Sequence, residues 1–230
     1  MLSDKKAIVT GASKGIGLEV SKLLTKHGVH VAGWSRSSPH FKDENFHAVP
    51  VDISDPYMVD HAYKETVDKI GEVDILINNA GYGIFAALEE MDTNVWEQMF
   101  ATNVHGVFYV TKKVIPGMKS KEGGHIINVG SIAGKNPIKN GACYSATKHA
   151  LTGLSHSLFM ELRYFGIKVS CIYPGSVQTN FFDNIDEIKA NDSMMSPSAV
   201  AKSILDLLQT APDYLPVDLE VRPLKPKVRA

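Results

Sequence analysis

Hydrophobic positions along the chain fall into short continuous runs that alternate with longer segments of helical spacing. The first run, residues 7–10, is mostly β-branched and stops at a glycine. A continuous apolar run bounded by turns is typical of a strand that is buried on both faces of a sheet. Further runs of this kind cover residues 29–34, 48–51, 73–78, 125–129, 168–173 and 219–221.

Segments with helical spacing lie between these runs, at residues 15–27, 56–70, 94–118, 144–165 and 197–208. Strands that alternate with helices imply right-handed crossovers, which place the strands in one parallel sheet covered on both faces. The pattern therefore predicts an α/β fold: a doubly wound, Rossmann-type, three-layer arrangement with a seven-stranded parallel sheet. No internal repeat or linker divides the 230 residues, so we expect one domain over residues 1–230.

Composition narrows the class of protein. Apolar residues make up 44% of the chain and charged residues 21%, which is ordinary for a soluble globular protein. A net charge of −1 gives no bulk attraction to nucleic acid or anionic membranes. No apolar run is long enough to span a bilayer, no signal-peptide pattern opens the chain, and two cysteines are too few for a disulfide framework. We expect a cytoplasmic protein without nucleic-acid or membrane partners.

A glycine-rich turn joins the first predicted strand to the first helix. It reads TGASKGIG over residues 10–17. Gly11 permits a positive φ, Gly15 permits close approach of a ligand, and Gly17 lets the helix pack closely on the sheet. The free N–H groups at the helix start suit a pyrophosphate. The G-x-x-x-G-x-G spacing differs from the better-known G-x-G-x-x-G, and a turn that serves only chain geometry is the alternative.

Cations stand where a dinucleotide-binding fold contacts the adenosine ribose. After the second predicted strand, an acidic residue would bind the 2′-OH of NAD, but this chain has Ser35 and Arg36 instead. Lys14 of the glycine turn is near the same place in such a fold. A guanidinium and an ammonium complement a 2′-phosphate, so we predict NADP(H) in preference to NAD(H). The alternative is that both are solvated surface charges.

Tyr144 and Lys148 form a candidate acid–base unit. They are four residues apart at the start of a predicted helix, so their side chains share one face. A phenol has a pKa of about 10, and a neighbouring ammonium lowers that value towards neutrality. Ser131 ends a predicted strand, at the carboxyl edge where open parallel sheets bind ligands, and its hydroxyl suits a carbonyl oxygen. The sequence Asn-Asn-Ala-Gly at 78–81 follows another strand at that edge. The alternative for Ser131, and likewise for residues 78–81, is an ordinary turn.

In their order and spacing, these motifs resemble the short-chain dehydrogenase/reductase family over most of the chain. Residues 10–17 are similar to its TGxxxGxG turn and residues 78–81 to its NNAG motif. The resemblance implies that Asn103, Ser131, Tyr144 and Lys148 are the catalytic residues. With the cations above, the predicted cofactor contacts are Gly11, Ser13, Lys14, Gly15, Ile16, Gly17, Ser35, Arg36, Asp52, Ile53, Asn79, Ala80, Gly81, Tyr144, Lys148, Pro174, Gly175, Val177 and Thr179.

The family resemblance implies a mechanism without a metal. Tyr144 would give a proton to a carbonyl oxygen held by Ser131, while NADPH delivers hydride to the carbonyl carbon. Lys148 would bind the nicotinamide ribose and lower the Tyr144 pKa, and Asn103 would support a water that leads to Lys148. The histidines show no spacing typical of metal ligands.

The resemblance leaves the substrate open. Residues 219–223 differ from the Val-Asp-Gly-Gly ending of family members that reduce acyl-carrier-bound ketones, so no fatty-acid substrate is assigned. Residues 181–196 take the place of the family's substrate loop. Its apolar residues suit an adaptable pocket or a segment packed on the body equally well, and they are Phe181, Phe182, Ile185, Ile188, Met194 and Met195.

Two other functions compete with a carbonyl reductase. One is an NAD-dependent alcohol or sugar dehydrogenase, and the other is a catalytically silent NADP(H)-binding sensor, since fold does not prove function. The resemblance also implies a homodimer or homotetramer paired through the helices at 94–118 and 144–165. The apolar stripe of leucines at 151, 154, 158 and 162 suits that interface or packing against the chain's own sheet.

Overall fold

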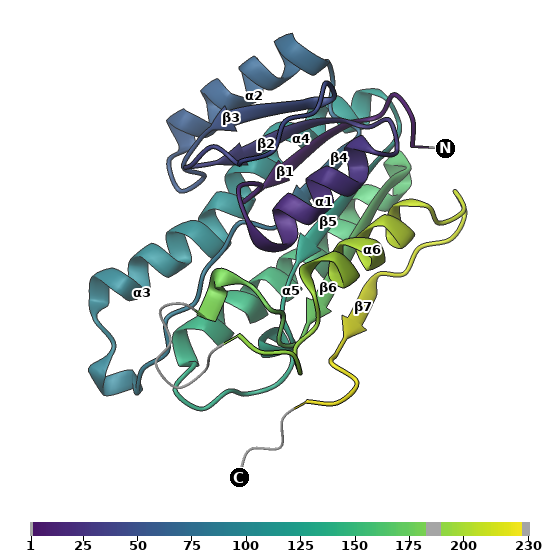
Figure 1. The fold of residues 1–230 in the computed structure, drawn as a ribbon. Coiled ribbons are helices and arrows are strands. Elements are labelled where there is room, and N and C mark those ends of the chain that lie inside the picture. Colours follow the sequence, from purple (N-terminus) through teal and green to yellow (C-terminus); the bar gives the residue numbers. More distant parts are fainter. Residues whose placement is uncertain (1, 183–189, 227–230) are drawn as a thin grey trace.

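Seven parallel strands form a single sheet at the centre of the molecule, in the order β3-β2-β1-β4-β5-β6-β7 (Figure 1). The structure is a computed structural model that describes residues 2–182 and 190–226. The strands are β1 (Lys6–Thr10), β2 (His30–Ser35), β3 (Phe46–Pro50), β4 (Ile75–Asn78), β5 (Gly124–Val129), β6 (Ile167–Pro174) and β7 (Asp218–Val221). The predicted seven-stranded parallel sheet is confirmed.

Helices cover both faces of this sheet. They are α1 (Gly15–Thr25), α2 (Pro56–Ile70), α3 (Thr93–Phe100), α4 (Val107–Ser120), α5 (Ala142–Leu162) and α6 (Pro197–Leu208). Helices α1 and α6 lie side by side on one face, where Leu24 and Ile204 share a core with β1 and β4 (Figure 1). On the other face, α2, α4 and α5 bury Val59, Val114 and Leu158 against the sheet. This is the doubly wound arrangement that the alternating pattern predicted.

The helical segment predicted at 94–118 is confirmed, but a π-helical turn lies inside it. The chain forms α3, then a π-helical turn at Ala101–Gly106, and then α4. The turn is set by tertiary contacts. A Cβ on Gly106 would lie 2.8 Å from Ile53 Cδ1, and the Asn103 side chain is held by the backbone of Tyr82. A π-helical turn of this kind is often found at functional sites.

The other element boundaries agree with the pattern to within a few residues. Helix α5 begins at Ala142 and ends at Leu162, after which a short 3₁₀ turn leads to Gly166, whose φ of +68° ends the helical segment. The leucines of its predicted apolar stripe face the chain itself: Leu158 and Leu162 are buried in the core on the α5 face of the sheet. That stripe is therefore not available to a second subunit.

The carboxyl ends of the central strands meet at one edge. The register pairs Val9 with Ile77, Ile77 with Ile127, and Val129 with Ile172. Residues that follow these strands are therefore brought together from distant parts of the sequence. Among the described residues, no helix combines the length and the apolar character needed to cross a membrane.

Candidate active site

Tyr144 and Lys148 lie on the first two turns of α5 and are both buried, with 7% and 6% of their surface exposed. Ser131 lies two residues beyond the end of β5 and not at the end of the strand as predicted, and it caps a short 3₁₀ turn by accepting a hydrogen bond from Ala133 N at 3.1 Å. Its hydroxyl also hydrogen-bonds Tyr144. The structure thus brings together three of the four predicted catalytic residues from two elements.

Burial dominates the electrostatics of the pair. It raises the pKa of Tyr144 to about 12, against a smaller lowering by the hydrogen bond with Ser131. It lowers the pKa of Lys148 to about 8. The prediction that Lys148 brings the Tyr144 pKa down is not met in this structure, because desolvation disfavours the phenolate and the ammonium alike. Lys148 Nζ lies 5.8 Å from the centroid of the Tyr144 ring and donates to Val129 O at 2.9 Å.

Asn103, the fourth predicted catalytic residue, is buried in the π-helical turn. Its Nδ2 donates to Tyr82 O at 2.8 Å and to Thr147 Oγ1 at 3.1 Å, and its Oδ1 accepts from Tyr82 N at 3.1 Å. A Cβ on Gly81 would lie 3.0 Å from Asn103 Oδ1 and 3.8 Å from Lys148 Nζ. Asn103 and Lys148 therefore border the same glycine of the 78–81 motif.

The glycine turn has the backbone that its sequence predicted. Gly11 and Gly15 have φ values of +67° and +59°. A Cβ on Gly17 would lie 2.3 Å from Gly11 O, so no other residue fits there without moving the turn. Lys14 takes the N-cap position of α1 without a capping side-chain hydrogen bond. Helices α2, α3 and α6, in contrast, are capped by the side chains of Asp55, Asp92 and Ser196.

Asn79 and Ala80 are fastened to this turn through Thr10, a residue whose role the sequence analysis did not identify. Thr10 Oγ1 accepts from Asn79 N at 2.9 Å and from Ala80 N at 3.0 Å. The amide of Asn79 donates to Thr10 O at 2.9 Å. These hydrogen bonds join the glycine turn at 10–17 to the 78–81 motif, and Asn79 forms two of them.

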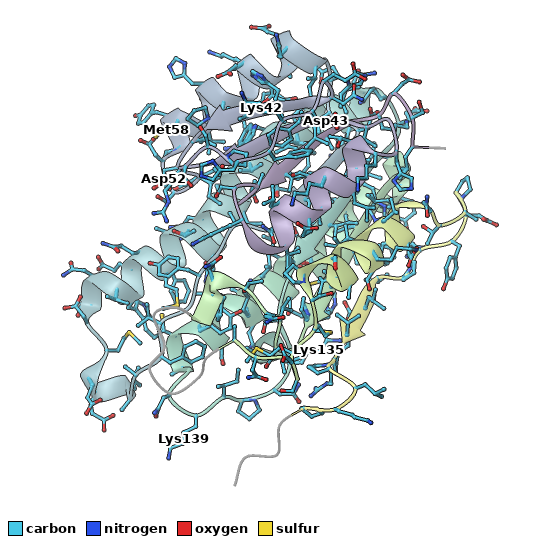
Figure 2. The ribbon with its side chains drawn as sticks, viewed as in Figure 1. Lys42, Asp43, Asp52, Met58, Lys135 and Lys139 are labelled. Carbon is cyan, nitrogen blue, oxygen red and sulfur yellow. The ribbon has the colours of Figure 1, made fainter. Side chains whose placement is uncertain are left out.

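The remaining predicted contacts are those to the adenosine end of the cofactor. Arg36 and Lys14 are both exposed, and neither forms an ion pair with another of the described residues. Ser35 Oγ donates to Ser37 O at 2.8 Å. Asp52, which follows β3 (Figure 2), accepts from Ser54 N and Ser54 Oγ, and Ile53 is buried next to the π-helical turn.

Tyr82, which follows the 78–81 motif, was not predicted as a site residue. Burial raises its pKa, the charge of Arg36 opposes that shift, and Asp52 adds to it. The Tyr82 phenol is therefore close enough to Arg36 and Asp52, two of the predicted adenosine contacts, for their charges to act on its pKa. Only its position directly after the motif could have indicated this.

The loop after β6 reaches the glycine turn. Pro174 ends the strand, Gly175 N donates to Val221 O at 2.8 Å, and Val177 pairs with Met195. The methyl group of Thr179 lies 3.3 Å from the place of a Cβ on Gly15. Of the four predicted residues of this loop, Thr179 therefore lies beside the glycine turn, whereas Gly175 contacts the end of β7 and Val177 is buried in the core.

The predicted substrate loop divides into two parts. Met195 packs against the core on the α1 and α6 face, whereas the ring of Phe181 packs against Tyr144, with centroids 5.4 Å apart. Met195 therefore follows the second interpretation, a segment packed on the body, whereas a pocket lined by Phe181 stays a prediction. The side chain of Phe182, together with Ile185 and Ile188, lies outside the described residues.

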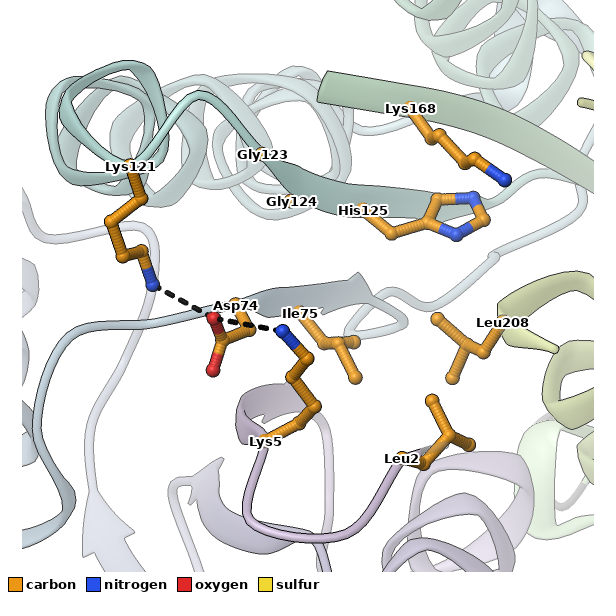
Figure 3. Close-up of a pocket in the computed structure, with 10 residues that line it drawn as sticks. All are labelled: Leu2, Lys5, Asp74, Ile75, Lys121, Gly123, Gly124, His125, Lys168 and Leu208. Carbon is orange, nitrogen blue, oxygen red and sulfur yellow. Dashed lines mark hydrogen bonds and ion pairs between the residues drawn. The ribbon is translucent and has the colours of Figure 1, made fainter. Parts of the chain in front are cut away.

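A cavity of about 320 Å³ lies at the opposite edge of the sheet, away from these residues (Figure 3). Its charged groups are already engaged: Lys121 and Lys5 pair with Asp74 at 2.9 and 3.7 Å, and Lys168 donates to three backbone carbonyls. None of the predicted site residues lines it. We therefore place the candidate active site at the carboxyl edge.

Comparison with known proteins gives matches over most of the chain. Residues 5–190 match the family model described as short chain dehydrogenase. An uncharacterized oxidoreductase of Staphylococcus saprophyticus is 33% identical over 234 residues, covering 97% of this chain and 99% of that protein.

Solved structures are similar over nearly the whole chain. A 3-ketoacyl-(acyl-carrier-protein) reductase from Brucella melitensis complexed with NADH has a TM-score of 0.89 at 28% identity, covering 97% of this chain and 99% of that one. The closed form of a serine dehydrogenase complexed with NADP+ has a TM-score of 0.88 at 27% identity, covering 94% of each chain.

Proposed function

The chain belongs to the short-chain dehydrogenase/reductase family, and on that premise we propose that it transfers hydride between NADP(H) and a carbonyl or alcohol substrate, acting as a ketone or aldehyde reductase. The family acts on small-molecule substrates. The observation that carries the proposal is the buried pair Tyr144 and Lys148, with Ser131 hydrogen-bonded to Tyr144, at the carboxyl edge of the sheet. Residues 1–230 form one catalytic domain in this proposal, with residues 181–196 as its substrate loop.

The residues present fit a nicotinamide dinucleotide. The uncapped start of α1 offers backbone N–H groups to a pyrophosphate, and Gly17, which has no side chain, allows the turn to pack closely against this helix. Thr179, in the loop after β6, approaches Gly15 of this turn. Gly81, in the loop after β4, approaches Lys148. When bound, the reduced nicotinamide supplies a hydride to the carbonyl carbon.

The chain's own residues handle the proton. A Tyr144 pKa of about 12 keeps the phenol protonated at neutral pH, as a proton donor in a reduction requires. Ser131 holds the substrate oxygen next to that phenol. Lys148, with a pKa of about 8, is mainly charged at neutral pH and can bind the nicotinamide ribose. Asn103 fixes the loop over Lys148, and a water beside Asn103 would connect Lys148 to solvent.

The preference for NADP(H) rests on charge. Arg36 and Lys14 have no ion-pair partner among the described residues, and no acidic residue ends β2. The negative charge of a 2′-phosphate would pair with these two cations. One solved relative is complexed with NADP+ and another with NADH, so an NAD-dependent alcohol or sugar dehydrogenase is the second candidate.

An initial-rate screen tests the proposal. Purified protein is given NADPH or NADH with aldehydes, diketones, quinones, ketosteroids, acetoacetyl thioesters and sugars, and nicotinamide absorbance is followed. Turnover with NADPH above NADH supports the proposal. A preference for NADH favours the second candidate, and cofactor binding without turnover favours a silent sensor.

We also propose that the protein is a homodimer or homotetramer in the cytoplasm. Exposed apolar side chains on α4, at the end of α5 and just after it support self-association: Phe108, Met160, Tyr164 and Phe165. Analytical ultracentrifugation measures the state directly, and a monomer at micromolar concentration would contradict this part.

A further inference from the structure

Two phenylalanine rings pack against the catalytic tyrosine. The centroid of the Tyr144 ring lies 5.5 Å from that of Phe85 and 5.4 Å from that of Phe181, and the two phenylalanine rings are 6.3 Å apart. These separations are typical of favourable aromatic contacts. The three residues come from the loop after β4, the loop after β6 and α5, so only the fold brings them together.

Gly83 lies where the three rings meet. A Cβ at this position would be 2.8 Å from Phe181 Cζ, 2.9 Å from Tyr144 Cδ2 and 3.2 Å from Phe85 Cε2. A side chain on residue 83 would therefore push the rings apart. The backbone of Gly83 and the two phenylalanine rings together form an aromatic wall around Tyr144.

This aromatic wall is held by backbone contacts. Ala86 N, next to Phe85, donates to Asn140 O at 2.8 Å. Phe181 N donates to Thr179 Oγ1 at 3.2 Å. The apolar surroundings continue beyond the rings in one hydrophobic cluster that includes Ile84, Trp96, Met99 and Ile138.

We propose that the substrate carries an aromatic or similarly flat apolar group directly beside its carbonyl, and that Phe85 and Phe181 select for that group. The inference rests on the proposed function and names its substrate class, such as aryl ketones, aryl aldehydes and quinones. A carbonyl reaches the Tyr144 hydroxyl beside these rings, so its flanking group contacts them. An aromatic group gains from that contact, whereas sugar hydroxyls or a carboxylate would lose water without new partners there.

The polar side chains beside Tyr144, those of Ser131 and Lys148, are used for hydrogen bonds other than contacts to the group that flanks the carbonyl. Ser131 hydrogen-bonds its hydroxyl, and Lys148 donates to Val129 O. In the reaction, the carbonyl carbon receives a hydride from the reduced nicotinamide and its oxygen receives the Tyr144 proton. The products are the alcohol and the oxidised nicotinamide, and a proton from solvent restores the phenol.

Matched substrates test the inference. We compare 1-phenylpropane-1,2-dione with butane-2,3-dione, which replaces the phenyl group by methyl, and with glyceraldehyde, which carries hydroxyls. For the unmodified protein we expect kcat/KM to be about 10–100-fold higher for the phenyl diketone than for the methyl diketone. Phe85→Ala and Phe181→Ala should each reduce that ratio about fivefold or more. Tyr57→Ala, which alters an exposed ring on α2, should leave it unchanged.

Comparing ratios between variants removes the intrinsic reactivity of each ketone, because it is the same for every variant. Phe85→Leu and Phe181→Leu replace any alanine variant that fails to fold. Turnover with no preference for the phenyl diketone, or ratios unaffected by both substitutions, would overturn the inference while leaving the proposed function standing.

Failure of the proposed function has a different signature, namely no turnover with any carbonyl compound. In that case isothermal titration calorimetry of the two diketones, with the protein saturated by NADP+, still tests the aromatic wall. Tighter binding of the phenyl diketone that weakens in Phe85→Ala supports the contact. Equal affinity for both diketones would overturn it.

Discussion

Asn103 holds the backbone of Tyr82 from both sides, donating to its carbonyl at 2.8 Å and accepting from its amide at 3.1 Å. This single side chain joins the π-helical turn before α4 to the loop that follows β4. The same loop carries Gly81, which borders Lys148, and Gly83, which borders Tyr144. This buried amide therefore helps to position the loop relative to Tyr144 and Lys148, the two proposed catalytic side chains.

Replacing Asn103 with alanine should therefore lower both stability and activity. The substitution leaves the buried N–H and C=O of Tyr82 without their side-chain partner, which costs about 2–3 kcal/mol of unfolding free energy. Urea denaturation with an unchanged m-value measures this loss. Asn136→Ala, which removes a longer hydrogen bond on an exposed loop, is the control. A loss equal to that of the control would contradict the positioning role.

Tyr144→Phe should abolish most turnover while cofactor affinity stays largely unchanged. Removing a general acid typically costs about 10²–10⁴-fold in rate, and the phenyl ring keeps the packing against Phe85 and Phe181. Steady-state kinetics and fluorescence titration with NADPH separate the two effects. Tyr57→Phe changes an exposed tyrosine on α2 and should retain full activity. If Tyr144→Phe kept activity close to that control, the acid–base role would be wrong.

Arg36→Ser combined with Lys14→Ser should weaken NADPH selectively. Each charge-assisted contact to a phosphate is worth about 1.5–3 kcal/mol, so we expect KM for NADPH to rise by about 10-fold or more with little change for NADH. The matched control is Lys26→Ser, which removes an exposed cation just after α1. Equal losses for both cofactors would show that the two cations are not 2′-phosphate contacts.

Gly17→Ala should destabilise the fold and weaken cofactor binding. The added methyl group would lie 2.3 Å from Gly11 O, and overpacking of this kind costs about 1–3 kcal/mol. Gly153→Ala is the opposite case, since its Cβ meets nothing within 4 Å on α5. That variant should gain about 0.5–1 kcal/mol from helix propensity. Thermal or urea unfolding of the two variants should therefore shift in opposite directions.

His125 should make the protein less stable in mild acid. Burial on β5 lowers its pKa to about 3, far below the value of about 6.5 in an unfolded chain. Below pH 6.5 the unfolded state therefore binds a proton that the folded state does not, and stability falls as the pH falls towards 3. Between pH 6.5 and 5 this amounts to about 2 kcal/mol.

Urea denaturation at pH 7 and pH 5 measures that difference. His125→Gln should show a smaller loss between the two pH values, because the group that titrates only in the unfolded state is gone. His61→Gln alters an exposed histidine of α2 and should behave like the unmodified protein. An identical loss in all three proteins would contradict the role of His125.

The sequence alone predicted the sheet, the number of its strands and the main motifs of the site. It did so because buried parallel strands leave continuous apolar runs, and because Gly11 and Gly15 adopt positive φ values that few other residues adopt. Gly17 is required for a different reason, since a Cβ there would collide with Gly11 O. The spacing of Tyr144 and Lys148 likewise follows from helix periodicity. These features depend on residues close together in the chain.

Tertiary structure alone decided the rest. The π-helical turn between α3 and α4 depends on contacts of Asn103 and Gly106 with loops after other strands, so helical spacing at 94–118 could not reveal it. The raised pKa of Tyr144 depends on burial against Phe85 and Phe181, which come from loops more than 35 residues away on either side. Burial is a sum over such distant neighbours, and for that reason only the folded chain determines the chemistry of this tyrosine.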